Sequence, residues 1–345
     1  MRVLALLEDP DGPSARLRFE PFARRLAAAG DAIERRALQG SGPCRWRELH
    51  AARGFDVVYL QRRLLQPWES AWLRARARRL VVDVDDALWR RDHPPFESWA
   101  RRARARALLR RADVVLAGSR TLAAELLALG VAAVELPTPI PDHLRDLRRD
   151  VEPSRAPTLC WIGQPSTWRY LAEIAPVWVR VRSVHPHARL IVVGGEHAPV
   201  AAIPGAESRT WSERAEVEVL STCDVGLAPL PDDPWTRGKC AARLLAYVAA
   251  GVAAVASPVG AQRELVEQVG GALLAATPAC FAQAAIELLG DAALRKRLVD
   301  EARPRIVAAR SCETLLARFR AALSAGARVS VGGGRELVAG PGADG

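Results

Sequence analysis

Residues 224–266 alternate between apolar runs and helix-forming stretches in a way that few folds allow. The first apolar run leads into a polar loop that contains Arg237, Gly238 and Lys239, and a helix pattern follows. A second apolar run comes next and ends in a Ser-Pro-Val-Gly turn that opens another helix. Continuous apolar strands separated by helices are typical of a parallel sheet covered by helices on both faces. The stretch therefore predicts an α/β fold.

The two loops of this stretch lie where ligands bind in such folds, at the carboxyl ends of parallel strands. Backbone N–H groups at the start of a helix, together with a cation, form a site for phosphate. Both loops lead into helices, and Lys239 is in the first of them. We therefore predict that a phosphorylated ligand binds near Lys239, with Arg237 and Arg243 as further cations. The alternative is a solvated basic turn without a ligand.

The alternation of strands and helices continues through most of the chain, interrupted by a proline-rich stretch after residue 136. Such a stretch is typical of a linker, so we predict two α/β domains with a binding cleft between them. The predicted segments are an N-terminal domain (1–140), a linker (141–157), a C-terminal domain (158–310), a helix with room to pack back on the first domain (311–325) and a disordered tail (326–345).

Hydrophobic periodicity also predicts the individual elements of both domains. We expect strands over 2–7, 56–61, 80–84, 113–117, 158–162 and 189–193. We expect helices over 15–29, 97–111, 120–129, 167–184 and 213–221, with Ser119 as the N-cap of the third.

Several classes of function are disfavoured by what the sequence contains. The six cysteines form no C-x-x-C pair, and the histidines form no metal-spaced set, so we predict no metal site. No G-x-G-x-x-G follows the first strand, which argues against a nicotinamide dehydrogenase. No apolar run reaches the roughly 18–20 residues of a membrane span. The apolar run at the N-terminus is too short for a signal peptide, so we expect a cytoplasmic location.

The positive charge of the chain is concentrated in its first half. The net charge is +10, and nearly all of the excess lies before residue 157. The predicted helix over 97–111 places Arg102, Arg106 and Arg110 on one face, where like charges repel. Codon usage in a GC-rich, bacterial genome explains an arginine-rich solvated face; peripheral contact with the inner face of an anionic membrane is the functional alternative. A nucleic-acid partner is disfavoured because no recognised module accompanies the charge.

Acidic residues gather at the end of one predicted strand, in the sequence VDVDDALW. Asp85 and Asp86 follow Asp83 closely, at a position where ligands bind in parallel sheets. Grouped carboxylates can bind a divalent cation, act in acid–base catalysis or orient sugar hydroxyls. A helix N-cap with solvated acids is the alternative.

A third loop that joins the end of an apolar strand to the start of a helix follows the strand over 158–162, in the sequence CWIGQPSTWRYL. Gly163 allows a ligand to approach the backbone closely, and Gln164 and Ser166 form the turn before a helix. An ordinary capped turn explains the pattern equally well. Trp211 follows a short strand and could stack on a nucleotide base, although packing in the core is the more common role of a tryptophan.

Taken together, CWIGQPSTWRYL, RLIVVGG and the stretch over 224–266 resemble the donor domain of retaining GT-B glycosyltransferases of the group 1 type, in a branch with a GKC loop. VDVDDALW and ADVVLAGSRTLAAEL resemble the acceptor domain of the same family. The resemblance implies two Rossmann-like α/β domains that face each other across a cleft. It also implies transfer of a sugar from a nucleotide-diphosphate sugar, as co-substrate, to an unknown acceptor, for which anionic and lipid-linked compounds are the candidates. The configuration at the anomeric carbon would be retained, without a required metal or other cofactor.

The resemblance also assigns roles to single residues. Asp85, Asp86 and Lys239 would be catalytic. The donor-binding residues would be Gly163, Gln164, Ser166, Trp211, Arg237, Lys239, Arg243, Gly260 and Glu264. The acceptor side would include Gly12, Ser14 and Arg16.

This chain departs from the family at three places. Gly238 and Ala246 stand where a pair of glutamates usually holds the ribose. Asp85 stands where a histidine is common. Gln164 and Arg169 replace the usual pair of cations after the first donor-domain strand. The alternative function is therefore a catalytically degenerate GT-B module that binds an anionic or protein partner.

Overall fold

In the computed structural model, the described residues are 1–40, 42–147, 149, 156–194, 200–324, 328–331 and 335–338. The chain forms two compact units. Unit 1 comprises Met1–Pro139, Arg237–Cys240 and Cys312–Gly345, and unit 2 comprises Ile140–Thr236 and Ala241–Ser311. Residues 148 and 150–155 of the predicted linker lie outside the described residues, and a short helix, α6 (Asp142–Arg145), precedes them.

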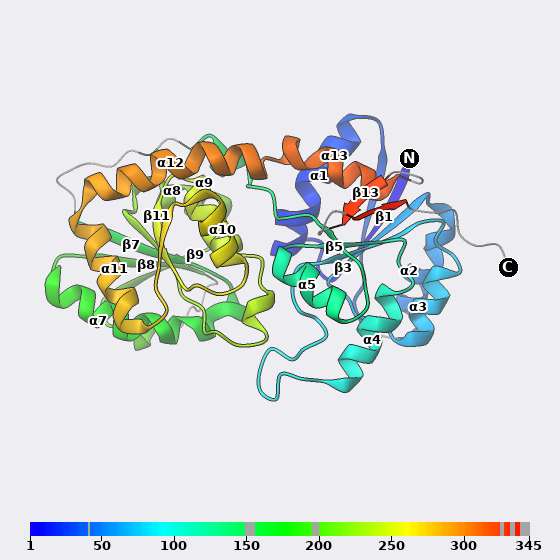
Figure 1. The fold of residues 1–345 in the computed structure, drawn as a ribbon, viewed down its shortest axis with the longest axis horizontal. Helices are drawn as coiled ribbons and strands as arrows, with labels where there is room; N and C mark the ends of the chain where they lie inside the picture. Colours follow the sequence, from blue (N-terminus) through cyan, green and yellow to red (C-terminus); the bar gives the residue numbers. More distant parts are fainter. Residues whose placement is uncertain are drawn as a thin grey trace. The chain divides into compact units, whose positions relative to one another are not determined.

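Unit 1 contains a six-stranded parallel sheet in the order β2-β1-β3-β4-β5-β6 (Figure 1). Its strands are β1 (Arg2–Leu7), β2 (Ala32–Ala37), β3 (Val57–Gln61), β4 (Leu80–Val84), β5 (Val114–Ala117) and β6 (Val134–Glu135). Its helices are α1 (Glu20–Ala28), α2 (Pro43–His50), α3 (Pro67–Arg74), α4 (Trp99–Leu109), α5 (Arg120–Ala128) and α13 (Cys312–Leu323). A π-helical turn over Ala15–Phe19 precedes α1, and a 3₁₀ turn over Ala51–Gly54 follows α2.

The core of unit 1 has two layers, one on each face of the sheet. Side chains of α2, α3, α4 and α5 pack on one face. Side chains of α1 and α13 pack on the other, where the rings of Phe22 and Phe319 stack 4.4 Å apart. Ser119 caps α5, because its Oγ accepts a hydrogen bond from the Leu122 N–H at 3.1 Å, as the sequence predicts.

Unit 2 contains a second six-stranded parallel sheet, in the order β12-β11-β10-β7-β8-β9. Its strands are β7 (Thr158–Ile162), β8 (Arg189–Gly194), β9 (Ala206–Thr210), β10 (Val225–Ala228), β11 (Ala253–Ala256) and β12 (Ala272–Leu274). Besides α6, its helices are α7 (Ile174–Val184), α8 (Glu213–Thr222), α9 (Ala242–Ala249), α10 (Ala261–Val269), α11 (Pro278–Gly290) and α12 (Ala292–Arg310). It also contains 3₁₀ segments over Pro165–Glu173 and Val200–Ala202. A further 3₁₀ turn, over Thr236–Gly238, begins at the last residue before the segment that groups with unit 1.

Strand order reverses once in each sheet, and the reversal marks the expected ligand site. In unit 1, β3 pairs with β1 on the side opposite β2. In unit 2, β10 pairs with β7 on the side opposite β8. The carboxyl ends of β1 and β3, and those of β7 and β10, are therefore the expected ligand sites.

Two predicted segments differ from the structure. The helix expected over Thr167–Val184 is a 3₁₀ segment followed by α7. Pro176 explains the break, because a proline lacks the N–H that a helix interior needs, and beginning α7 at Ile174 places it in the first turn. Within the tail predicted to be disordered, β13 (Arg328–Val331) and β14 (Arg335–Val338) pair in antiparallel fashion, and the other residues after 324 lie outside the described residues.

No helix within the described part of the chain combines the length and the apolar character needed to cross a bilayer.

Candidate functional site

In unit 1 the strand register aligns the carboxyl ends of β1, β3 and β4, so the polar loops that begin there are neighbours. Leu7 at the end of β1 pairs with Gln61 of β3, and Gln61 pairs with Asp83 of β4. The residues that follow these positions therefore lie side by side at the carboxyl edge of the sheet. They include Arg62 after β3 and Asp85 after β4.

Asp83 belongs to a buried ion pair beneath this edge. Its Oδ1 and Oδ2 accept hydrogen bonds from Arg18 Nη2 at 2.5 Å and Nε at 3.0 Å. Burial alone would lower the pKa of Arg18, but the charge and hydrogen bonds of Asp83 outweigh it and raise the pKa. Gln61 Nε2 also donates to Asp83 Oδ2 at 3.0 Å. With these partners, Asp83 is structural, so the carboxylates available for chemistry are Asp85 and Asp86.

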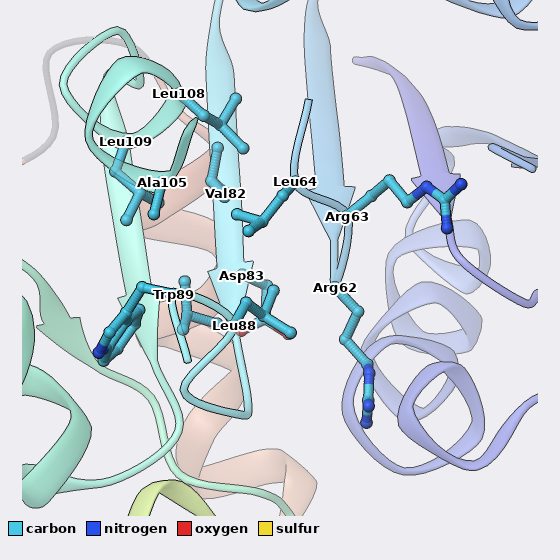
Figure 2. A pocket seen from close by; sticks show the side chains of 11 residues that line it. Arg62, Arg63, Leu64, Val82, Asp83, Leu88, Trp89, Ala105, Leu108 and Leu109 are labelled. Atoms are coloured by element: carbon cyan, nitrogen blue, oxygen red, sulfur yellow. The ribbon is translucent and has the colours of Figure 1, made fainter. Parts of the chain in front are cut away.

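Arg62, which no sequence motif singles out, contacts both of these carboxylates. Its Nη2 lies 3.0 Å from Asp86 Oδ2, and its Nη1 lies 3.6 Å from Asp85 Oδ2. Its backbone φ is +57°, a left-handed conformation that is uncommon outside glycine and is concentrated at functional sites. Figure 2 shows Arg62 and Arg63 leaving the end of β3 in different directions. The turn thus aims one of two adjacent arginines at the acidic pair.

Asp85 is a buried carboxyl group with unused hydrogen-bonding capacity. Its side chain is 6% exposed, and its Oδ1 has no hydrogen-bond partner. Burial raises the pKa of Asp85 above its ordinary value; Arg62 opposes the rise, while Asp86 and Asp83 add to it. A buried carboxyl group with a raised pKa and a free acceptor atom is a candidate for binding a hydroxyl or transferring a proton.

Lys239 joins the same cluster, because Arg237–Cys240 belongs to unit 1. Its Nζ lies 3.2 Å from Asp86 Oδ1, and the Cys240 thiol donates to the Asp85 carbonyl oxygen at 3.0 Å. The structure therefore brings together Asp85, Asp86 and Lys239, the three residues predicted to be catalytic. Arg237, in the same segment, is exposed.

Packing explains the glycine at position 238, where the resemblance would place a glutamate. A Cβ at this position would lie 2.6 Å from the Ala87 Cβ and 2.9 Å from the Ala87 backbone nitrogen. Both contacts are closer than real Cβ atoms show, so no side chain fits without a backbone shift. Ala246, at the second glutamate position, is buried in the core of unit 2. Neither position can therefore offer a carboxylate to a ribose.

The predicted acceptor-side residues occupy the turn after β1. The Ser14 Oγ accepts a hydrogen bond from Arg62 Nη1 at 2.9 Å, which connects Ser14 to the acidic pair. Gly12 lies against the side chain of Asp9, and its carbonyl oxygen accepts a hydrogen bond from the Arg16 N–H at 3.0 Å. The Arg16 side chain is half-buried in the first helical turn.

In unit 2, three loops meet at the carboxyl edge where strand order reverses. Gly163 and Gln164 follow β7, and a Cβ on Gly163 would meet the Trp161 ring at 2.1 Å, so only glycine fits. The Gln164 N–H donates to Thr167 Oγ1 at 2.9 Å, and Ser166 beside it is exposed.

The loop after β11 completes this edge. Ser257 Oγ accepts a hydrogen bond from the Leu230 N–H at 3.0 Å and so connects the loops that follow β10 and β11. Gly260 is the N-cap of α10 with φ +48°, and Glu264 lies in the first turn of that helix. Trp211 follows β9 and is half-buried against the hydrophobic core of unit 2.

Arg243 is the cation at this edge. Its guanidinium lies 4.3 Å from the Trp161 ring centroid and donates to the Ile162 carbonyl oxygen at the end of β7. Burial lowers the pKa of Arg243, yet an arginine remains protonated in proteins. No carboxylate of the described residues forms an ion pair with it. A half-buried cation without an anionic side-chain partner favours an anionic ligand.

The Tyr247 hydroxyl connects β7 and β10 through hydrogen bonds. Its hydroxyl accepts a hydrogen bond from the Ile162 N–H at 3.0 Å and lies within hydrogen-bond distance of the Leu227 carbonyl oxygen at 3.2 Å. Gly226 makes room for the ring, because a Cβ there would lie 2.4 Å from it.

Removal of the Tyr247 hydroxyl should destabilise unit 2. In Tyr247→Phe the buried Ile162 N–H loses its acceptor, so the free energy of unfolding should fall by about 1–3 kcal/mol. Urea denaturation followed by circular dichroism measures this change. An unchanged free energy would contradict the assigned hydrogen bond.

The pH profile should reveal the contact between Arg62 and Asp85. If ionised Asp85 is needed for activity, its raised pKa places the acid limb of kcat/KM above the ordinary aspartate value of about 3.9. Arg62 lowers this pKa, so Arg62→Gln should move the acid limb to still higher pH. Arg63→Gln is the matched control, because Arg63 shares Glu8 with Arg62 but forms no ion pair with Asp85 or Asp86 among the described residues. Equal profiles for the two variants would argue against the contact.

No group of three or more His, Cys, Asp or Glu side chains in the described ranges is arranged to hold a metal ion.

Comparison with known proteins gives two family matches. Residues 2–141 match the family described as "Glycosyl transferase 4-like domain", and residues 156–291 match "Glycosyl transferases group 1". Together the matches cover most of the chain. No curated protein matches the sequence.

Solved structures of similar fold span nearly the same length. Sucrose-phosphate synthase from Thermosynechococcus elongatus has a TM-score of 0.71 at 15% identity, with coverage of 93% of this chain and 98% of that one. Anabaena Alr3699/HepE in complex with UDP-glucose has a TM-score of 0.66 at 15% identity and the same coverage. WaaG, a glycosyltransferase involved in lipopolysaccharide biosynthesis, has a TM-score of 0.63 at 13% identity, again with 93% and 98% coverage.

The two parallel sheets with flanking helices, the order of their strands and the two family matches agree with one another. The chain belongs to the glycosyltransferases of the GT-B fold, with a glycosyl transferase 4-like domain followed by a group 1 domain.

Proposed function

We propose that this glycosyltransferase transfers a sugar from a UDP-sugar to a hydroxyl acceptor and retains the configuration at the anomeric carbon. The observation that carries the proposal is Arg243, a half-buried cation without a carboxylate partner at the strand reversal of unit 2. UDP is favoured over other nucleotides because the similar structures include HepE with UDP and with UDP-glucose. Retention follows from the likeness to the retaining group 1 type.

In this proposal, unit 2 binds the donor. Arg243 neutralises the diphosphate, and the N-terminus of α10, which begins after Gly260, adds backbone N–H groups. Lys239, in the segment Arg237–Cys240 that groups with unit 1, is proposed as a further cation for the diphosphate. Gly163 and Gln164 approach the donor through backbone and amide groups. Lys239 can leave Asp86 for a diphosphate without stranding that carboxylate, because Arg62 also holds Asp86.

The chemistry assigned to these residues concerns the bond between the anomeric carbon and the diphosphate oxygen. As it breaks, UDP leaves with the bonding electrons, and the cations stabilise its growing charge. The acceptor hydroxyl oxygen forms the new bond, and Asp85 accepts its proton. Asp85 and Asp86 orient hydroxyl groups near the reacting carbon and balance its positive charge. We propose that this needs no metal, so EDTA should leave turnover unchanged.

Unit 1 is proposed to hold the acceptor through the Ser14 turn and to contact an anionic membrane peripherally. The chemical identity of the acceptor is therefore sought among lipid-linked hydroxyl compounds.

Thermal unfolding with UDP, GDP, dTDP or ADP tests the donor part of the proposal. A ligand at 100 times its dissociation constant should stabilise the protein by about 2.7 kcal/mol. We expect the largest shift with UDP, and its loss in Arg243→Gln. Equal shifts in melting temperature with all four nucleotides would contradict the choice of UDP. Binding of UDP without turnover of any UDP-sugar would instead favour the degenerate module.

A further inference from the structure

Three tryptophans of unit 1 are exposed to solvent, although the common role of a tryptophan is packing in the core. Trp99 is 84% exposed, Trp68 62% and Trp72 38%. They are the only tryptophans among the exposed large apolar side chains of the described residues, and all three lie on α3 or α4. Isolated apolar residues on a surface need no explanation, but several indoles on neighbouring helices do.

The topology places two of these indoles, those of Trp68 and Trp99, at one end of unit 1. α3 and α4 pack on the same face of the sheet and follow the adjacent parallel strands β3 and β4 (Figure 1). Both helices therefore begin at the carboxyl edge. Trp68 is the second residue of α3, and Trp99 is the first residue of α4. Their indoles thus lie at the end of the unit that also carries the Arg62–Asp85 cluster.

Helix α4 also carries a concentrated positive charge. Residues 99–111 contain six arginines and no acidic residue. Arg101, Arg106 and Arg111 donate hydrogen bonds to backbone carbonyl oxygens, which do not neutralise them. Arginines spaced four residues apart on one helix repel each other, so an anionic partner would relieve a cost built into α4. Arg102 pairs with Glu97 at 3.2 Å, and Arg106 reaches the Leu129 carbonyl oxygen at the end of α5. We therefore call Arg101, Arg104, Arg111, Trp68 and Trp99 the α3–α4 surface.

Exposed indoles beside arginines fit one partner best, the headgroup region of an anionic bilayer. Tryptophan favours the membrane–water interface because its ring is apolar and its N–H is polar. Anionic lipids attract nearby arginines. Single-stranded nucleic acids also use aromatic and basic side chains, but they need a groove in which successive bases stack. Indoles in the first turns of two separate helices suit insertion between headgroups better.

We propose that the α3–α4 surface docks unit 1 on a bilayer that contains anionic phospholipids, with Trp68 and Trp99 at headgroup depth. Docking at this end would bring the Asp85 edge close to a lipid-linked acceptor; this consequence rests on the proposed function, whereas the docking itself does not.

Sedimentation of the full chain with lipid vesicles tests the proposal. The vesicles contain phosphatidylcholine alone or with phosphatidylglycerol. The wild type should bind only the anionic vesicles, and less at high salt. Trp68→Ser with Trp99→Ser should weaken binding about tenfold or more. Arg104→Gln with Arg111→Gln should weaken it about 25-fold, or fivefold for each arginine. The matched controls Leu127→Ser and Arg180→Gln, exposed elsewhere, should bind like the wild type.

Several outcomes would overturn the docking. They are no binding to anionic vesicles, equal binding to both kinds, wild-type binding by the tryptophan and arginine variants, and tighter binding to single-stranded RNA than to vesicles. Hydrolysis of UDP-sugars in solution, measured on the same samples, separates the two proposals. Vesicle binding without hydrolysis would count against the proposed function alone, and hydrolysis without vesicle binding would count against the docking alone.

Discussion

Asp85→Asn is expected to lower kcat by about 10²- to 10⁴-fold, the usual contribution of a positioned acid–base group. The variant keeps the shape of the side chain but cannot ionise. The unpartnered Oδ1 and the raised pKa of Asp85 both indicate a group kept for chemistry rather than for packing. Steady-state kinetics with a UDP-sugar measures the change, and Asp92→Asn, at an exposed position, is the control.

The same substitution, Asp85→Asn, should leave the stability of the folded protein unchanged or raise it, although it lowers kcat. The folded-state pKa of Asp85 is raised, so the stability linked to its protonated form is present at low pH and lost as pH rises through that pKa. At neutral pH the ionised carboxylate therefore costs stability, and Asp85→Asn should melt at the same temperature or higher. Arg62 still has Asp86 as a partner in this variant. A large drop in melting temperature together with unchanged kcat would show that Asp85 is structural.

Lys239→Ala should lower kcat by about 10²- to 10³-fold, the loss seen when one fixed group that stabilises transition-state charge is removed. The fold should survive, because Asp86 keeps its 3.0 Å ion pair with Arg62. Arg243 is a poorer probe, since its removal also takes a hydrogen bond from the end of β7.

The chain supplies a matched control for this experiment. Lys296 is the only other lysine, and it is exposed on α12 with a partner one helical turn away. Lys296→Ala should turn over like the wild type. If both lysine variants kept full activity, Lys239 would not be the cation that the diphosphate requires.

Sequence patterns were sufficient for the main architecture. Apolar runs identified the central strands, including β4 and β7 with the predicted bounds, because both faces of these strands are covered. They did not reveal β2, whose sequence AIERRA alternates poorly. β2 is an edge strand, and charged residues are common on edges because they prevent pairing with other chains.

The candidate site was only partly predictable for a similar reason. Asp85, Asp86 and Lys239 stand out because each follows an apolar strand in the sequence. Arg62 does not, since QRRLL contains two adjacent arginines that look equivalent. Its role depends on a left-handed backbone and on Asp85 and Asp86 in the loop after β4, which are brought to it by the tertiary fold. The role of Tyr247 likewise depends on the pairing of β7 with β10.

The central claim is that this glycosyltransferase uses a UDP-sugar and retains its anomeric configuration. The most direct test is incubation with a panel of nucleotide sugars and a lipid-linked acceptor, with NMR assignment of the new anomeric carbon. The account predicts release of UDP and a product with the α configuration of the donor. A β-linked product would contradict retention, and turnover of only GDP-, dTDP- or ADP-sugars would contradict the choice of donor.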